Sequence, residues 1–234
     1  MKTAKSGGIA AIFLAIGAFV ALAWGILPPF TAAKAVLTAI FGALAVAAAS
    51  GFGGLKRTWP LLIGLALMAA GGAYLSKITT GLALLFLSNL FFALYFILSG
   101  KLGKKGFALG AAVMIAYVLY FVFGMMPQLS NVSGALQLSN NAAGGIFFLF
   151  FLAAALVPAV SFGGTGGAWT RFFSALSGFC CAMFYFILAE GFFGGRLTLN
   201  PYFYPVFTLA ILLLSAAGTL RGRAVNCAEP RDLE

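Results

Sequence analysis

Long runs of apolar residues, separated by short polar or turn-forming breaks, follow one another along the whole chain. Each run approaches the length of about 20 residues that an α-helix needs to cross the hydrocarbon core of a bilayer. The pattern therefore predicts an all-α fold, a polytopic transmembrane helix bundle. The predicted spans are 8–27, 32–50, 59–75, 80–99, 106–126, 144–162, 172–192 and 201–219.

The breaks between these runs contain residues that favour turns. Pro28 and Pro29 follow the first run, glycines dominate 51–54, and the longest break, 127–143, carries no charged residue. We predict a single transmembrane domain over 1–220, followed by a short cytoplasmic tail over 221–234.

Basic residues test the number of spans, because the short cytoplasmic loops of membrane proteins carry an excess of Lys and Arg. With eight spans and both termini in the cytoplasm, only Lys34, Lys77 and Arg196 of the 14 Lys and Arg residues fall outside. This asymmetry favours eight spans over seven or nine. The residues that then fall inside are Lys2, Lys5, Lys56, Arg57, Lys101, Lys104, Lys105, Arg171, Arg221, Arg223 and Arg231.

Composition supports a membrane protein. The chain is 63% hydrophobic and 8% charged, with a mean hydropathy of +1.09, whereas soluble domains carry about 25% charged residues. The net charge of +10 could attract nucleic acid, but the basic residues fall in loops beside the spans, so we expect membrane lipids as partners and no nucleic acid. We predict a location in a bacterial cytoplasmic membrane. The first run could be a signal peptide, but its length favours a span.

Residues suited to metal binding and to acid–base catalysis are scarce. The chain has no histidine, which removes the commonest metal ligand and the commonest general base near neutral pH. Cys180 and Cys181 are adjacent and Cys227 stands alone, so the cysteines do not follow the spacing of a metal site. We expect no metal and no cofactor.

A few polar side chains fall inside the predicted spans, where polar groups are costly and often functional. Ser88 and Asn89 lie near the middle of 80–99, and Tyr95 follows one and a half turns later. Asn89 could also serve only to join two helices by a hydrogen bond, which contributes about 0.6 kcal/mol on average in membranes. We expect Asn89 to face inward in either case.

Glu190, near the outer end of the span 172–192, is the acidic residue that could act in catalysis, and it is the candidate catalytic residue of the chain. It could instead form a solvated pair with Arg196 at the membrane interface, an arrangement that contributes little to stability.

The stretch 61–98 resembles the YhhN family of membrane proteins, to which the lysoplasmalogenases belong. Gly71 and Gly72 stand where the family has Gly-Asp, followed here by Tyr74 and a leucine. Gly81 opens the next span as in the family, and eight residues later Asn89 stands where the family has a histidine, with Tyr95 after it.

A second similarity lies in 177–189, where the family has a Ser-Asp pattern and this chain has Tyr185 or Phe186 at the aspartate position. The resemblance implies an eight-span fold and hydrolysis of the vinyl ether of lysoplasmalogens, which yields a fatty aldehyde and a glycerophospho-alcohol. Such hydrolysis needs groups that exchange protons near neutral pH, and both carboxylates and the histidine are replaced here.

We therefore expect a relative that binds lipid or lysolipid in an intramembrane cavity and has lost hydrolysis. Two alternatives remain open: an active membrane hydrolase of lysoplasmalogen-like ether lipids that uses Glu190 and tyrosines, and a small permease or structural membrane subunit. The candidate lipid-binding residues are Gly71, Gly72, Tyr74, Ser88, Asn89, Tyr95 and Tyr185.

Overall fold

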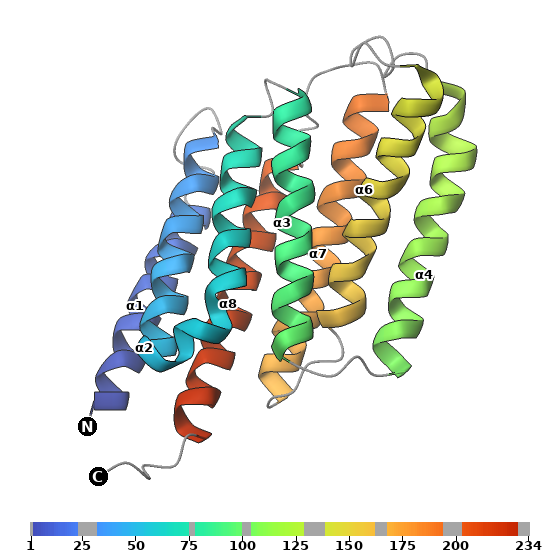
Figure 1. The fold of residues 1–234 in the computed structure, drawn as a ribbon. Coiled ribbons are helices and arrows are strands. Elements are labelled where there is room, and N and C mark those ends of the chain that lie inside the picture. Colours follow the sequence, from blue (N-terminus) through green and yellow to red (C-terminus); the bar gives the residue numbers. More distant parts are fainter. Residues whose placement is uncertain are drawn as a thin grey trace.

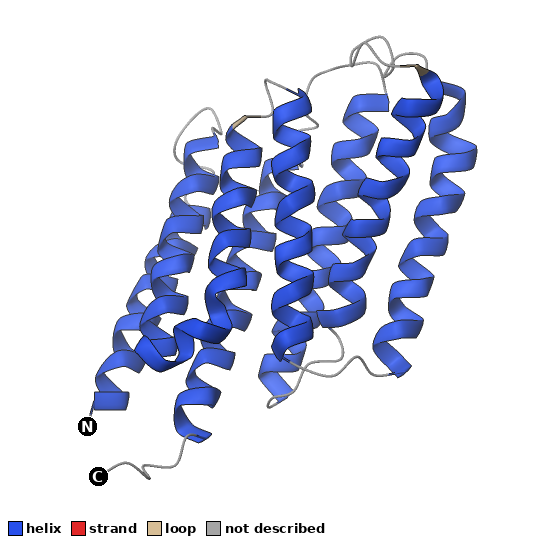
Figure 2. Ribbon diagram, in the orientation of Figure 1, coloured by secondary structure: helices blue, strands red, loops and turns tan. Residues whose placement is uncertain are grey.

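The computed structural model describes residues 2–22, 32–74, 78–99, 104–128, 139–161, 168–193 and 203–228. Every regular element within these ranges is helical (Figure 2), which confirms the predicted all-α class. The helices are α1 (Lys2–Leu22), α2 (Ala32–Ala73), α3 (Ile78–Ser99), α4 (Lys104–Tyr120), α6 (Asn140–Ser161), α7 (Ala168–Phe193) and α8 (Phe203–Ala228). A π-helical turn, η2 (Phe121–Met125), and a 3₁₀ turn, η3 (Met126–Gln128), continue α4.

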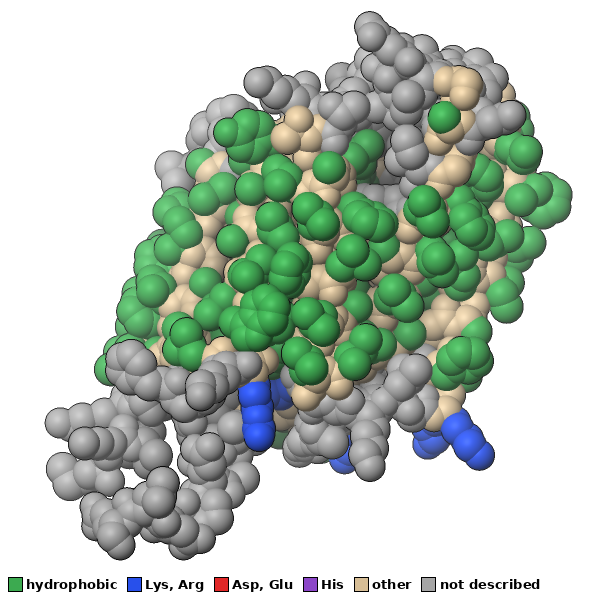
Figure 3. Space-filling model, in the orientation of Figure 1, with side chains coloured by type: hydrophobic (Ala, Val, Ile, Leu, Met, Phe, Trp, Pro, Cys, Tyr) green, Lys and Arg blue, Asp and Glu red, His purple; other side chains and the backbone are tan. Residues whose placement is uncertain are grey.

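Four of these helices are long and apolar enough to cross a membrane, over Ala33–Ser50, Thr80–Leu98, Phe107–Gly124 and Ala168–Leu188. Large apolar side chains also cover the outer surface: Phe19 is 71% exposed and Phe123 is 77% exposed. Figure 3 shows such side chains over the middle of the molecule. A continuous apolar surface of this kind is stable only against lipid, so the protein is an integral membrane protein.

Helix α2 folds back on itself. If it were straight, Val36 and Ala70 would lie about 51 Å apart, at 1.5 Å per residue. Both residues instead line the same groove, and Figure 1 shows the helix turning sharply at one end of the bundle. The element therefore consists of two antiparallel arms, 32–50 and 59–73, which correspond to two of the runs predicted as spans. Pro60 stands near the start of the second arm, where the lost N–H has little cost.

The helices form one bundle in which segments distant in sequence lie side by side (Figure 1). Helix α2 packs against α1, α3 and α8, while α6 packs against α3, α4 and α7. Helix α4 lies at the edge of the bundle, where the hydroxyl of Tyr117 ties it to α7 by donating a hydrogen bond of 2.7 Å to the carbonyl oxygen of Ala182.

Glycines allow the closest helix contacts. A Cβ atom at Gly42 would overlap the side chain of Ser215, and one at Gly110 would overlap Ala159. Helices in lipid associate through such close packing, because lipid supplies no hydrophobic drive between them. Gly110, four residues after Gly106 in the sequence, lies in the contact between α4 and α6.

Exposed cations gather at one end of the bundle, which we call the basic end. Arg57, Lys104, Lys105 and Arg171 are exposed, and on the face drawn in Figure 3 the blue side chains lie at the end where both termini lie in Figure 1. Helix α8 continues to Ala228. The first eight residues of the predicted tail are therefore helical, and Arg221 is buried inside the bundle.

Candidate functional site

Three of the predicted site residues meet in the interior between α3 and α7. Ser88, Asn89 and Tyr185 are all fully buried. The hydroxyls of Ser88 and Tyr185 both donate to the carbonyl oxygen of Leu85, at 2.7 and 3.3 Å. The side chains of Ser88 and Asn89 lie beside the Tyr185 hydroxyl. We call Ser88, Asn89 and Tyr185 the α3–α7 cluster.

The chemistry of the α3–α7 cluster is that of hydrogen bonding. Neither side-chain polar atom of Asn89 has a hydrogen-bond partner among the described residues. Its amide offers two N–H donors and an acceptor oxygen, so it can hold a polar group, but it does not exchange protons near neutral pH. The cluster contains hydroxyl and amide groups and no carboxylate.

The glycine pair Gly71–Gly72 serves packing. A Cβ atom at Gly71 would lie 2.8 Å from the side chain of Leu85, and one at Gly72 would lie 2.7 Å from the ring of Phe207. The pair thus lets the second arm of α2 approach α3 and α8 closely. Tyr74, two residues later, is 51% exposed and lies outside the interior.

Tyr95 lies farther along α3, toward the basic end, and is buried beside Arg221 of α8. The guanidinium carbon of Arg221 is 5.8 Å from the centre of the Tyr95 ring and 5.0 Å from that of Phe96. The sequence placed Arg221 at the start of a solvated tail, so this contact was missed. The one available signal was the position of Arg221 directly after an apolar run, which is equally typical of a loop residue.

Glu190 is exposed on α7, where it lies near Tyr120 of α4, and the structure does not place it in the buried α3–α7 cluster. The residue suggested as its interfacial partner, Arg196, lies outside the described residues. The described residues also hold no group of three or more Cys, Asp or Glu side chains placed to bind a metal ion. Cys180 and Cys181 are buried free thiols.

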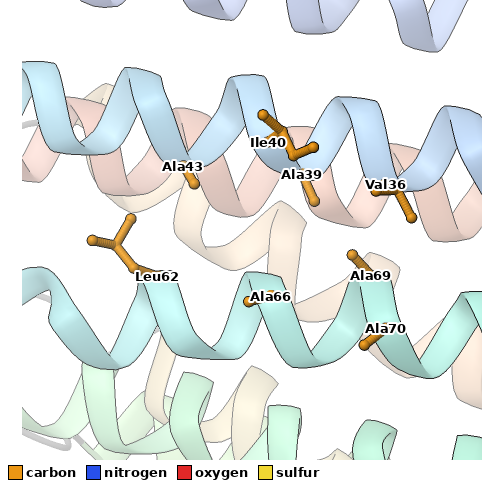
Figure 4. Close-up of a pocket in the computed structure, with 8 residues that line it drawn as sticks. All are labelled: Val36, Ala39, Ile40, Ala43, Leu62, Ala66, Ala69 and Ala70. Carbon is orange, nitrogen blue, oxygen red and sulfur yellow. The ribbon is translucent and has the colours of Figure 1, made fainter.

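An apolar groove lies between the two arms of α2 (Figure 4). Its volume is about 310 Å³, close to the lower end of the range of about 300–1,000 Å³ for small-molecule sites. Its lining comes from alanines and a few larger aliphatic side chains, several of them partly exposed. The lining residues are Val36, Ala39, Ile40, Ala43, Leu62, Ala66, Ala69 and Ala70.

The groove and the α3–α7 cluster are separate features, because no predicted site residue lines the groove. The second arm of α2 turns Leu62, Ala66 and Ala70 toward the groove, whereas a Cβ atom on Gly64 would meet Phe92 of α3 on another face. The sequence analysis missed the groove, since its walls are ordinary apolar residues that only the fold-back of α2 brings together. Comparison with family models, with curated proteins and with solved structures finds no match to this chain.

Proposed function

We propose that this protein is an eight-span membrane protein, with both termini in the cytoplasm, that binds a lipid or lysolipid without hydrolysing it, the acyl chain lying in the groove between the arms of α2. The observation that carries the proposal is the groove itself. All of its lining side chains are apolar, and it opens on a surface that includes Ile40, 48% exposed. In a bilayer such a surface faces acyl chains, so an acyl chain is the occupant that the chemistry favours.

The small side chains of the groove support this assignment. Ala39, Ala43, Ala66 and Ala69 face one another across the arms (Figure 4), where larger residues would close the gap by packing at interior density. A flexible acyl chain can fill such a channel through dispersion contacts along its length.

The α3–α7 cluster favours binding over hydrolysis. Cleavage of a vinyl ether needs a proton donor for the alkene carbon and a base for water, with pKa values near neutrality. Asn89 does not titrate, the α3–α7 cluster contains no carboxylate, and Glu190 is exposed on α7 outside the cluster. Asn89, at the position of the family's histidine in the YhhN resemblance, lies beside Tyr185. Tyr185 is one of the two residues, with Phe186, that the resemblance places at the aspartate position, and this supports a shared layout with altered chemistry.

Binding of a fluorescent lysophospholipid to the full-length protein in nanodiscs tests the groove. Ala66→Phe places a ring in the groove and is expected to weaken lipid binding at least about tenfold. The ring would displace several carbons of the acyl chain, and burial of that many carbons contributes more than about 1.4 kcal/mol of binding free energy. Ala112→Phe is the matched control, since Ala112 is exposed on α4. Equal binding by both variants would exclude the groove as the site.

Turnover tests the absence of hydrolysis. An alkenyl lysophospholipid is incubated with the purified protein and aldehyde release is followed, with an active lysoplasmalogenase as the positive control. We expect no release above background. Release that Glu190→Gln abolishes would establish the hydrolase alternative instead.

A further inference from the structure

Arg221 is a buried cation whose hydrogen bonds are incomplete. Its side chain is 5% exposed, and Nη2 donates a hydrogen bond of 3.2 Å to Oγ of Ser174 on α7. Nε and Nη1 have no hydrogen-bond partner among the described residues. These two nitrogens carry three of the five N–H donors of a guanidinium. A buried charged group with unmet donors is among the costliest states in a protein interior.

The surrounding groups hold the guanidinium in place without neutralising it. The rings of Phe96 and Tyr95 lie 5.0 and 5.8 Å from its central carbon, contacts typical of a cation against aromatic rings. Ser174 is fully buried, and its hydroxyl is a further donor beside the guanidinium. The backbone of α7 is fixed there, since the Ser177 hydroxyl donates to the carbonyl oxygen of Ser174 at 2.7 Å.

No carboxylate in the described ranges is placed to neutralise Arg221. Glu190 is the one acidic residue in these ranges, and it follows Ser174 on α7 by 16 residues, or about 24 Å along the helix. Among the described residues, the exposed charges of the basic end are cations, and Arg171 precedes Ser174 on α7 by three residues. Their field attracts anions to this end of the bundle.

From these contacts we propose that Arg221, with Ser174, forms an anion site that takes a phosphate group. A guanidinium is planar and matches phosphate oxygens with strong, charge-assisted hydrogen bonds. Under the proposed topology the site lies near the cytoplasmic interface, where lipid phosphates are located. The phosphate comes from a lipid headgroup or from free phosphate, since both offer the same oxygens. This site is distinct from the groove and does not depend on a lipid occupying it.

Ligand binding to the full-length protein in detergent tests the proposal, with the concentration-dependent rise in Tm as the readout. The probes are inorganic phosphate, dioctanoyl phosphatidic acid and dioctanoylglycerol, which has the same chains and no phosphate. Stabilisation by phosphatidic acid alone assigns a lipid headgroup, and stabilisation by inorganic phosphate as well assigns a free-phosphate site. Either result supports the proposal. No stabilisation by either phosphate probe, or equal stabilisation by dioctanoylglycerol, overturns it.

Variants locate the site. Arg221→Gln is expected to weaken phosphate binding at least about tenfold, because one charge-assisted hydrogen bond contributes that much. Arg221→Lys keeps the charge but loses the planar arrangement of donors, so it tests the site if the Gln variant does not fold, and it too is expected to bind more weakly. Arg57→Gln is the control for surface charge at the same end. A loss of binding in Arg57→Gln as large as in the Arg221 variants would overturn the proposal.

The carboxylates of the chain's own C-terminus, which lie outside the described residues, are the competing counter-charge. A variant with Glu229→Gln, Asp232→Asn and Glu234→Gln removes all three. Phosphate binding at the wild-type level in this variant supports the proposal. Binding that appears only in the variant would show that the tail neutralises Arg221 in the natural protein, and it would overturn the proposal. Ala66→Phe in the α2 groove is expected to leave the binding of inorganic phosphate unchanged, which separates this site from the proposed acyl-chain site.

Discussion

At the scale of single residues, some buried polar side chains form hydrogen bonds within their own helix and others do not. Buried hydroxyls donate to carbonyls of their own helix: Thr38 to Lys34 and Ser215 to Ile211, both at 2.8 Å. Such back-bonding is how Ser and Thr are accommodated within helices in lipid. Among the described residues, the hydroxyls of Ser50 and Thr208 lack a hydrogen-bond partner, but only Asn89 and Arg221 have two buried polar atoms each without one. A ligand could therefore supply the most missing hydrogen bonds at these two residues.

Replacement of Asn89 tests how far its buried amide lowers the stability of the protein. Asn89→Leu exchanges an amide that has no hydrogen-bond partner among the described residues for an apolar side chain of similar shape. We expect the free energy of unfolding of the ligand-free protein to rise by about 1 kcal/mol. The measurement is denaturant unfolding in mixed micelles.

Ser88→Ala is the paired control, because Ser88 donates to the carbonyl oxygen of Leu85 at 2.7 Å. This change is expected to lower the free energy of unfolding by about 0.6 kcal/mol, the average for hydrogen bonds in a membrane interior. A loss of stability in Asn89→Leu would show that the amide is hydrogen-bonded in the membrane.

At the scale of helices, substitution is most restricted at glycines that lie in the contact between two helices. The second arm of α2 carries Gly64, Gly71 and Gly72, and a Cβ atom at any of them would meet a side chain of α3 or α8 closer than 3 Å. The neighbour of Gly72, Phe207, is fully buried and cannot move outward without displacing other residues. Substitution there therefore strains the contact between α2 and α8 rather than the backbone of α2.

Gly72→Ala is expected to lower the free energy of unfolding by about 1–3 kcal/mol, the usual cost of overpacking a core. Phe207→Leu in the same protein should recover part of the loss, which a double-mutant cycle would measure as a coupling energy. Gly145→Ala is the control, since its Cβ atom would meet nothing within 4 Å, and there the change should stabilise by about 0.4–1 kcal/mol. Additive effects of Gly72→Ala and Phe207→Leu would argue against direct overpacking.

The hydrophobic pattern was sufficient to predict an all-helical fold, because crossing a bilayer imposes length and apolarity on each segment separately. It did not predict that the glycine-rich break at 51–54 is itself helical and joins two predicted spans in α2. It also placed Asn89 in the interior, since a polar group in the middle of a span avoids lipid. It could not predict which helix faces meet: the groove depends on the pairing of Val36 with Ala70 across the two arms of α2. The burial of Arg221 was missed for a related reason. The side chains that surround its guanidinium, among them Ser174 and Phe96, are distant from it in the sequence.

At the scale of the whole molecule, the distribution of charge points to one orientation in the membrane. The exposed cations Arg57, Lys105 and Arg171 lie at the basic end (Figure 3), whereas Ser139, exposed before α6, follows α4 and lies toward the other end. Cytoplasmic loops are the ones enriched in Lys and Arg. An eight-span protein with cytoplasmic termini therefore places Arg57 and Lys105 inside and Ser139 outside.

Cysteine labelling in oriented membrane vesicles tests this topology. Single cysteines at Arg57, Lys105 and Ser139, in a background without the native cysteines, are treated with a membrane-impermeant maleimide. We expect Ser139→Cys to react in right-side-out vesicles, and Arg57→Cys and Lys105→Cys to react only in inverted ones. One span, α4, lies between Lys105 and Ser139, whereas two, the second arm of α2 and α3, lie between Arg57 and Lys105. Reaction of Lys105→Cys and Ser139→Cys from the same side would mean that α4 does not cross. The eight-span arrangement, and with it the cytoplasmic position of the Arg221 site, would then be wrong.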